Sequence, residues 1–293
     1  MPTLFSLNSD LSENVPYNNP AFPFHIHKED EISHYSISHW HDDLEFVVIL
    51  EGELFYMVNG QKIPLQRGEG LFINSKSIHY GTLEDCDYCS FIACLFSLKL
   101  FPDNAYFLEE YVKPLISDPM IPFQKLSLDS SWQKEIMTLI TNLYEIFSCK
   151  EEPFIALESL SRIVKLLTEH AVSSQGSKPP TNSEEIQIVT AMMGYVQKNY
   201  ANKILLKDLA LAGNCCKTRC TQLFQKYLST SPMVYVNNYR LEKSRSLLRY
   251  SNYSVTEISY LCGFTSSSYF CEAFHKYYDL TPKQYRKQNP LNS

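Results

Sequence analysis

The sequence predicts two domains of different class: a small antiparallel β-barrel with two helices, and an all-α domain with two helix-turn-helix units. Residues 22–98 form short runs of aromatic and β-branched residues separated by turn signals, as in small antiparallel barrels or jelly rolls. Residues 204–288 carry one pattern twice, with a period of about 50 residues. A linker between the two parts is indicated by a stretch rich in Ser, Gly and Pro. We therefore expect an N-terminal arm, a barrel domain, a linker and a helical domain at residues 1–20, 21–172, 173–183 and 184–293.

The composition is that of a globular protein, with 44% hydrophobic and 20% charged residues among 293. No apolar run reaches the length of a membrane span, so no membrane partner is expected. The nine cysteines are odd in number and scattered, which favours reduced thiols in a cytoplasmic protein over a disulfide framework. Cys86 and Cys89 have the spacing of a redox or metal pair, but no second pair lies at zinc-ribbon distance.

The two predicted domains differ in charge. Residues 184–293 hold 14 Lys/Arg and 7 Asp/Glu, a net charge of +7, whereas residues 1–183 carry a net charge of −13. A basic domain beside an acidic one predicts a polyanionic partner for the C-terminal domain alone.

The elements of the N-terminal domain follow from local signals. Asn59-Gly60 is a strong hairpin turn between two runs of strand-forming residues. Residues 99–130 contain four prolines and are expected to form an irregular connector. Residues 131–148 and 154–171 show apolar residues at helical spacing. These two helices can cover the barrel or pair with a second subunit.

Each copy of the C-terminal repeat carries helix signals in the same order. Ser254 and Glu257 form a capping box, and Gly263-Phe264 ends the helix that follows. A second helix begins near 265–267, and a long helix at about 232–250 joins the two copies. The second helix is expected to bury one face formed by Tyr269, Phe270, Ala273, Phe274 and Tyr277.

This repeat resembles the DNA-binding domain of the AraC/XylS family of bacterial transcription regulators. The matching residues include Leu209-Ala210, Leu223-Phe224, Ser231-Pro232, Tyr239-Arg240-Leu241, Glu257-Ile258, Gly263-Phe264, Ser268-Tyr269-Phe270, Thr281-Pro282 and Tyr285-Arg286. The resemblance implies that two helix-turn-helix units place their recognition helices in successive major-groove segments of double-stranded DNA.

Candidate DNA contacts lie on the outward faces of the two recognition helices. They are Lys217, Thr218, Arg219, Thr221, Gln222, Gln225, Ser266, Ser267, Ser268, Cys271, Glu272 and Lys276. Arg can bind guanine in a bidentate manner, and Gln can read adenine. The family resemblance places Thr218, Thr221, Gln222, Ser267, Cys271 and Glu272 at base-facing sites. Phosphate contacts or solvated charges are expected at Lys226, Lys276, Arg240, Lys283, Arg286 and Lys287.

Three departures from the family pattern affect these expectations. Leu205 stands where a Ser helix cap is common, so the first unit lacks that cap. Ser229 and Asp279 stand where glycine usually follows each recognition helix, in a left-handed conformation. Glu272 stands where Arg is frequent; its carboxylate repels phosphate but can accept a hydrogen bond from cytosine.

A histidine-rich motif lies inside the β region. His39-x-His41-x3-Glu45-x6-Gly52 resembles the first cupin motif, and residues 68–79 match the second motif in part, ending at His79. On a continuous strand, residues 39, 41 and 45 would face the barrel interior together. The four side chains could bind Fe, Mn or Zn, could contact an organic ligand such as a sugar or acid, or could only satisfy one another.

AraC-type regulators commonly carry a cupin barrel without metal, so the resemblance favours organic contacts, with no metal and no cofactor. Aromatic residues near the motif could stack on a sugar, although aromatic residues in strands more often belong to a core. They are Trp40, Phe46, Tyr56, Phe72 and Tyr80, of which Trp40 and Tyr56 join His39, His41, Glu45 and His79 as ligand candidates.

These observations predict a ligand-responsive transcription regulator rather than an enzyme. We expect an activator that acts as a homodimer, binds a small-molecule effector for which a sugar is one candidate, and works with RNA polymerase. Two alternatives remain: a metal-dependent cupin enzyme fused to a DNA-binding module, and a regulator whose barrel only dimerises.

Overall fold

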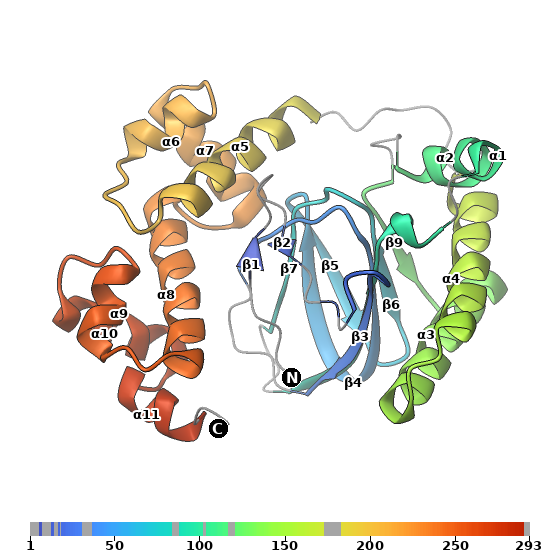
Figure 1. Ribbon diagram of the computed structural model, residues 1–293. Coiled ribbons are helices and arrows are strands. Elements are labelled where there is room, and N and C mark those ends of the chain that lie inside the picture. Colours follow the sequence, from blue (N-terminus) through green and yellow to red (C-terminus); the bar gives the residue numbers. More distant parts are fainter. Residues whose placement is uncertain are drawn as a thin grey trace. The chain divides into compact units, whose positions relative to one another are not determined.

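The computed structural model describes residues 6–7, 13–14, 17, 19–30, 37–83, 88–101, 104–116, 121–172 and 183–289. The chain divides into two compact units (Figure 1), a barrel unit and a helical unit. Most of the expected arm and linker, together with Cys86, lies outside the described residues. The eight described cysteines are free thiols. No helix within the described ranges is long and apolar enough to cross a membrane.

The barrel unit is built around one long strand. The strands are β3 (Phe24–Glu29), β4 (Leu44–Val58), β5 (Gln61–Gln66), β6 (Gly70–Ile73), β7 (His79–Thr82), β8 (Cys89–Phe96) and β9 (Phe123–Leu126). A sheet runs in the order β3-β8-β4-β6-β9, and β5 and β7 pair with the second half of β4. All of these pairings are antiparallel, as the sequence predicts for a small barrel.

A bulge lets β4 belong to both groups of strands. The register between β4 and β8 shifts between Ile49 and Glu51, and Gly52 follows with a φ of 77°. A Cβ at Gly52 would lie 2.4 Å from the backbone oxygen of Tyr88, so this position admits only glycine.

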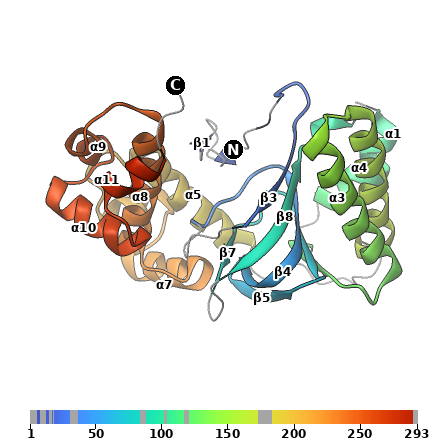
Figure 2. The same cartoon turned by 90° about the horizontal axis from the view of Figure 1, so that it is seen from below.

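Successive residues of β4 serve two different cores because strand side chains alternate between faces. Phe46 and Val48 belong to the core between the sheet and the helices, whereas Val47 and Ile49 belong to the core inside the barrel. The helices α3 (Ser131–Cys149) and α4 (Pro153–Leu167) lie side by side along the outer face of the curved sheet (Figure 2). Their apolar stripes are therefore buried within the chain.

The expectation of an irregular connector at 99–130 is wrong in part. This segment contains η1 (Leu98–Leu100), α1 (Ala105–Phe107), η2 (Leu108–Val112), α2 (Lys113–Ile116) and β9, and η3 (Thr168–Val172) follows α4. Strand β9 comes directly after Pro122 and pairs with β6. Its four residues are too few to show a strand pattern, and only the long-range pairing with β6 defines it.

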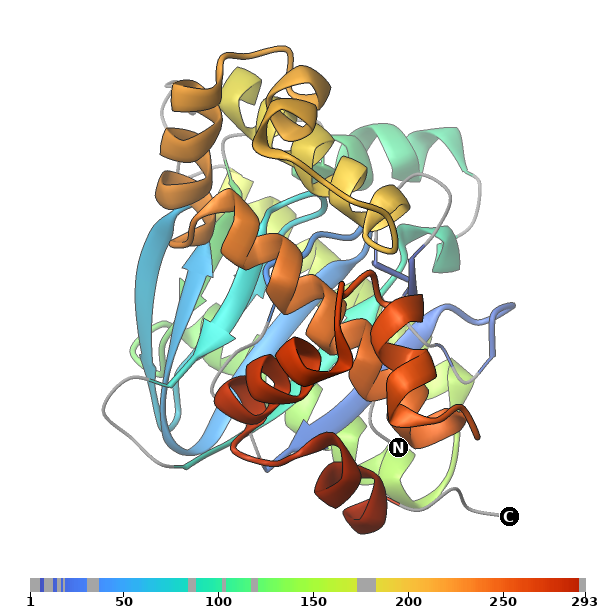
Figure 3. The ribbon, with the colours of Figure 1, turned by 90° about the vertical axis from the view of Figure 1, so that its left-hand side faces the viewer.

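The helical unit has the predicted repeat. Its helices are α5 (Ser183–Asn199), α6 (Leu206–Ala212), α7 (Lys217–Leu228), α8 (Pro232–Tyr250), α9 (Val255–Leu261), α10 (Ser267–Tyr278) and α11 (Pro282–Gln288). The short strands β1 (Ser6–Leu7) and β2 (Glu13–Asn14) pair with each other. Helix α8 joins the α6–α7 pair to the α9–α10 pair (Figure 3). The repeat-related Phe224 and Phe274 are both fully buried.

The residues that cap the helices of the helical unit determine where these helices begin and end. Ser229 and Asp279 end α7 and α10 with φ values of 51° and 55°, the left-handed conformation in which glycine is usual. Leu205 gives α6 no side-chain cap, but Asp208 accepts a hydrogen bond from the Leu205 amide at 2.9 Å. The first unit therefore keeps half of a capping box.

One residue of the predicted buried face is exposed. Tyr269 in the first turn of α10 is 46% exposed, and its hydroxyl accepts a hydrogen bond from Asn237 Nδ2 at 3.0 Å. Phe270 and Phe274 of the same helix are fully buried. Tyr269 lies one residue before the buried stripe, so it reaches α8 rather than the core.

Gly263 provides a test of this turn. Its φ is 80°, and an added Cβ would lie 2.3 Å from the backbone oxygen of Tyr200. We expect Gly263→Ala to lower the free energy of unfolding by at least about 2 kcal/mol, because the backbone itself must move. Thermal unfolding of the full chain, followed by helical circular dichroism, measures the change.

Gly68→Ala is the matched control. Gly68 has a φ of 84°, but its Cβ would meet only the end of the Leu128 side chain, at 3.2 Å. Left-handed strain alone should cost about 1 kcal/mol there. Equal losses in the two variants would show that the close approach to Tyr200 is unimportant.

Candidate functional site

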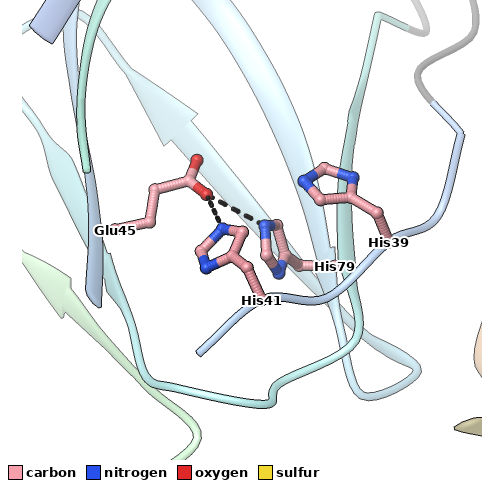
Figure 4. A group of neighbouring side chains, drawn as sticks. All are labelled: His39, His41, Glu45 and His79. Carbon is pink, nitrogen blue, oxygen red and sulfur yellow. Dashed lines mark hydrogen bonds and ion pairs between the residues drawn. The ribbon is translucent and has the colours of Figure 1, made fainter. Parts of the chain in front are cut away.

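Four polar side chains converge inside the barrel unit (Figure 4). His39 and His41 lie just before β4, Glu45 lies on β4, and His79 lies on β7. One potential ligand atom from each residue lies within 4.8 Å of the others. His41, Glu45 and His79 are at most 5% exposed. We call these four residues the His/Glu cluster.

The His/Glu cluster is assembled differently from the expected continuous strand. The chain bends at 42–43, so His39 and His41 are outside β4. His39 instead forms an isolated bridge with His79, with backbone hydrogen bonds of 3.1 and 2.9 Å in the two directions. This bridge brings together imidazoles that are forty positions apart in the sequence.

Hydrogen bonds fix the orientation of two imidazoles. His41 Nδ1 lies 3.0 Å from the backbone oxygen of Asp43, and His79 Nδ1 lies 2.8 Å from that of Ser77. The Nε2 atoms of both rings lie 3.0 and 2.9 Å from the same carboxylate oxygen, Oε2 of Glu45. Tyr56 donates from its hydroxyl to Oε1 of Glu45 at 3.4 Å.

The positions of the protons define what the cluster can bind. A carbonyl oxygen only accepts, so each Nδ1 carries a hydrogen, and each Nε2 can donate to Glu45 only in an imidazolium. Burial alone would raise the pKa of the Glu45 carboxyl, but the charge of His79 and the hydrogen bonds from His41 and His79 hold that pKa well below its usual range. The two Nε2 atoms could ligate a bound cation, and imidazoles held at Nδ1 by carbonyl oxygens are typical of metal ligands. The four residues therefore fit a transition-metal ion as well as an organic ligand.

Two further histidines face the barrel interior, and the sequence motifs did not identify them as site residues. His25 and His27 on β3 pair with Leu95 and Ala93, which belong to the interior core. His25 Nε2 and His27 Nδ1 are buried and have no hydrogen-bond partner among the described residues. Burial lowers the pKa of His25 to about 4, and the nearby His27 contributes; burial also lowers the pKa of His27. The His-x-His alternation at the start of β3 was the available signal.

The aromatic candidates separate into two groups. Tyr56 contacts Glu45, and Trp40 is 8% exposed with an indole nitrogen that has no partner in the described part of the chain. Phe46 and Phe72 instead belong to the core beneath the helices. Stacking of these two phenylalanines on an interior ligand is therefore excluded, because Phe46 and Glu45 lie on opposite faces of β4.

The second candidate site is the outer surface of the two recognition helices, α7 and α10. On α7, all six candidates are exposed: Lys217, Thr218, Arg219, Thr221, Gln222 and Gln225. On α10, Ser268, Glu272 and Lys276 are exposed, whereas Ser266, Ser267 and Cys271 are partly buried. The Ser266 hydroxyl caps α10 by accepting from the Tyr269 amide at 3.2 Å.

Two arginines that were expected to contact phosphate donate to backbone oxygens instead. Arg240 donates to the backbone oxygens of Tyr200 and Asn202, both at 2.8 Å. Arg286 donates to those of Leu248 and Tyr253, at 3.2 and 2.6 Å. These arginines hold turns in place, which their sequence positions did not indicate.

Glu185, in the first turn of α5, forms a network with α7. Its carboxylate accepts hydrogen bonds from Arg219 Nη2, from Lys226 Nζ at 2.6 Å and from the Tyr227 hydroxyl at 2.7 Å. The hydrogen bonds from Lys226, Tyr227 and Arg219 outweigh burial and lower the pKa of Glu185 to about 2. We call these four residues the Glu185 network.

Comparison with known proteins agrees with the predicted fold class. The chain matches the helix-turn-helix domain family over residues 209–288 and the cupin domain family over residues 24–92. It is 29% identical over 290 residues to YdeC, an uncharacterized HTH-type transcriptional regulator of Bacillus subtilis, covering 97% of this chain and 99% of YdeC.

Two other relatives have more specific names. The melibiose operon regulatory protein of Escherichia coli is 24% identical over 260 residues, with 85% of this chain and 83% of that protein covered. The transcriptional activator RhaS of Pectobacterium atrosepticum is 26% identical over 253 residues, with 85% and 87% covered. Among solved structures, ToxT from Vibrio cholerae O395 aligns over 91% of this chain and 98% of ToxT, with 12% identity and a TM-score of 0.48.

A cupin domain followed by a double helix-turn-helix domain defines a DNA-binding transcription regulator with an N-terminal ligand-binding domain. Within that class, the chain resembles the AraC-type regulators in its helix-turn-helix repeat and in its cupin domain.

Glu45 tests the energetics of the His/Glu cluster. We expect Glu45→Ala to lower the free energy of unfolding of the barrel unit by about 3–5 kcal/mol, because both Nε2 atoms lose their buried partner. Both tryptophans, Trp40 and Trp132, lie in the barrel unit, so the midpoint of tryptophan fluorescence in a urea titration reports this unit.

Asp42→Ala is the control for Glu45→Ala. Asp42 is exposed and lies 3.8 Å from Lys76, a weak surface pair. Its removal should change the free energy of unfolding by less than about 0.5 kcal/mol. A loss below about 1 kcal/mol in Glu45→Ala would contradict a tightly coupled buried cluster.

Proposed function

We propose that this regulator activates transcription in response to a small, uncharged, hydroxyl-rich molecule, of which a sugar is the leading candidate. The observation that carries the effector proposal is the pair of buried imidazole nitrogens on His25 and His27 without described partners. Buried polar atoms normally have hydrogen-bond partners, and a ligand can supply them. The lowered pKa values keep both rings neutral near pH 7, so each offers a donor and an acceptor that suit hydroxyl groups.

The relatives support the same proposal. One is named for the melibiose operon and another is named as an activator. We propose that the protein acts in the cytoplasm, as a homodimer and together with RNA polymerase, without catalysing a reaction of its own. The relatives are regulators, and the described thiols are free. Because α3 and α4 bury most of their apolar stripes on the sheet, a dimer would use their outer faces, where Phe154 is 87% exposed.

Effector binding can be measured on the full chain by thermal shift and calorimetry with a panel of sugars that includes melibiose. A ligand at 100 times its Kd stabilises the folded state by about 2.7 kcal/mol. We expect His25→Leu to weaken binding at least tenfold, a loss of about 1.4 kcal/mol. His275→Ala, an exposed change on α10, is the control and should bind normally. Binding that is indifferent to His25→Leu would reject the proposed ligand contacts.

A metal ion is the second candidate, favoured by the four ligand atoms within 4.8 Å of one another. His39, His41, Glu45 and His79 would hold the ion, and it would supply a Lewis-acid contact for an oxygen of the effector. Metal analysis of the purified chain separates the candidates. Stoichiometric Fe, Mn or Zn that is lost in His41→Ala and kept in His25→Leu would favour the metal.

DNA reading is tested by comparing Gln222→Ala with Lys276→Ala. Gln222 is exposed on the second turn of α7, where side chains reach base edges, whereas Lys276 is exposed near the end of α10. Loss of the Gln222 contact should cost about 1–3 kcal/mol and blur the preferred site. Loss of Lys276 should weaken the binding of all DNA sequences alike, and it should reduce the slope of log Kobs against log salt by about one.

The measurement is a binding selection of the full chain on randomised duplex DNA at several salt concentrations. An unchanged preferred site in Gln222→Ala, or an altered one in Lys276→Ala, would show that these two roles are wrongly assigned.

A further inference from the structure

In the first recognition helix, α7, most of the basic side chains are paired with an acidic residue. Helix α7 has three basic residues, Lys217, Arg219 and Lys226, and two of them donate to the single carboxylate of Glu185. Arg219 and Lys226 are seven residues apart, so they lie on one side of α7 two turns from each other. That side lies between the buried stripe and the outward positions Thr218 and Gln222.

The surroundings of the Glu185 carboxylate favour its ion pairs with Arg219 and Lys226. Its side chain is 18% exposed, whereas those of Arg219 and Lys226 are 44% and 47% exposed. The Tyr227 hydroxyl, from the buried face of α7, holds the same oxygen that receives Lys226. The hydrogen bond from Tyr227 therefore fixes the position of the Glu185 carboxylate, and Glu185 in turn holds the exposed side chains of Arg219 and Lys226 near α5.

The second recognition helix, α10, lacks this arrangement. Tyr269 and Lys276 of α10 occupy the repeat positions of Arg219 and Lys226. Lys276 has no ion pair among the residues that the structure describes. The buried Glu242 of α8 pairs with Arg245 of its own helix at 3.2 Å. The arrangement of one acid holding two cations of a recognition helix is confined, in the described chain, to the first unit.

We propose that Glu185 is a positioning residue that withholds Arg219 and Lys226 from DNA phosphates and thereby limits sequence-independent binding by the first unit. This inference rests on DNA binding through α7. Each cation that contacts a phosphate releases counterions and steepens the dependence of log Kobs on log salt by about 0.9. A cation that already has a carboxylate partner gains less from a phosphate, so α7 binds DNA chiefly through its outward polar residues.

The test is the salt slope of the full chain on a short duplex of mixed sequence. Glu185→Gln keeps the shape of the side chain but removes its charge, and we expect it to bind more tightly at low salt with a slope steeper by about one to two. Glu184→Gln is the matched control, because Glu184 is the exposed neighbour in the same helical turn and forms no hydrogen bond or ion pair with the described residues of α7. Equal slopes in these two variants would overturn the proposal.

A second arm removes the cations and does not depend on the folding of Glu185→Gln. Arg219→Gln combined with Lys226→Gln should change the wild-type slope by less than about 0.5, and should abolish the gain when added to Glu185→Gln. A wild-type slope that falls by about two in this double variant would mean that both cations already contact phosphate, which also overturns the proposal. If the wild-type chain binds no duplex even at low salt, the proposed DNA binding is rejected. If it does bind, the comparison of slopes tests only the role of Glu185.

Discussion

The two-residue period of β4 is the constraint on which the barrel unit depends. Four other strands pair with β4, so its register is fixed along its whole length. Glu45, Val47 and Ile49 face inward and Phe46 and Val48 face the helices. A slip of one residue would exchange these faces, placing a carboxylate under α3 and two aromatic or branched side chains among histidines. The apolar packing of Phe46 therefore positions Glu45 in the interior.

In each unit, one carboxylate is the hydrogen-bonding partner of three other side chains. Glu45 receives His41, His79 and Tyr56, and Glu185 receives Arg219, Lys226 and Tyr227. The two acids differ in exposure, which decides what they can do. Glu45 is buried, so its donors have no competing solvent, and a cation or ligand must enter the barrel to reach them. Glu185 lies at the edge of the surface, where phosphate and solvent compete for the same donors.

Local signals account for the parts of the structure that the sequence predicts. The capping box at Ser254, the hairpin at Asn59-Gly60 and the break at Gly263 act within a few residues, so the elements they bound are predictable. The missed features need long-range register. His25 reaches the interior only because β3 pairs with β8, and β9 exists only beside β6. The partners of Glu185 are 34 to 42 residues away, and no periodicity marks such a contact.

The repeat separates what packing requires from what recognition requires. Phe224 and Phe274 are both fully buried, and Ser229 and Asp279 adopt the same left-handed turn, because both copies must close the same core. The outward positions have no such constraint, and they differ: Gln222 corresponds to Glu272. A neutral amide and a carboxylate favour different base edges, since Gln suits adenine and Glu suits cytosine. Two units with equal cores and unequal surfaces should therefore read two unlike segments of one site, with each copy setting its own preference.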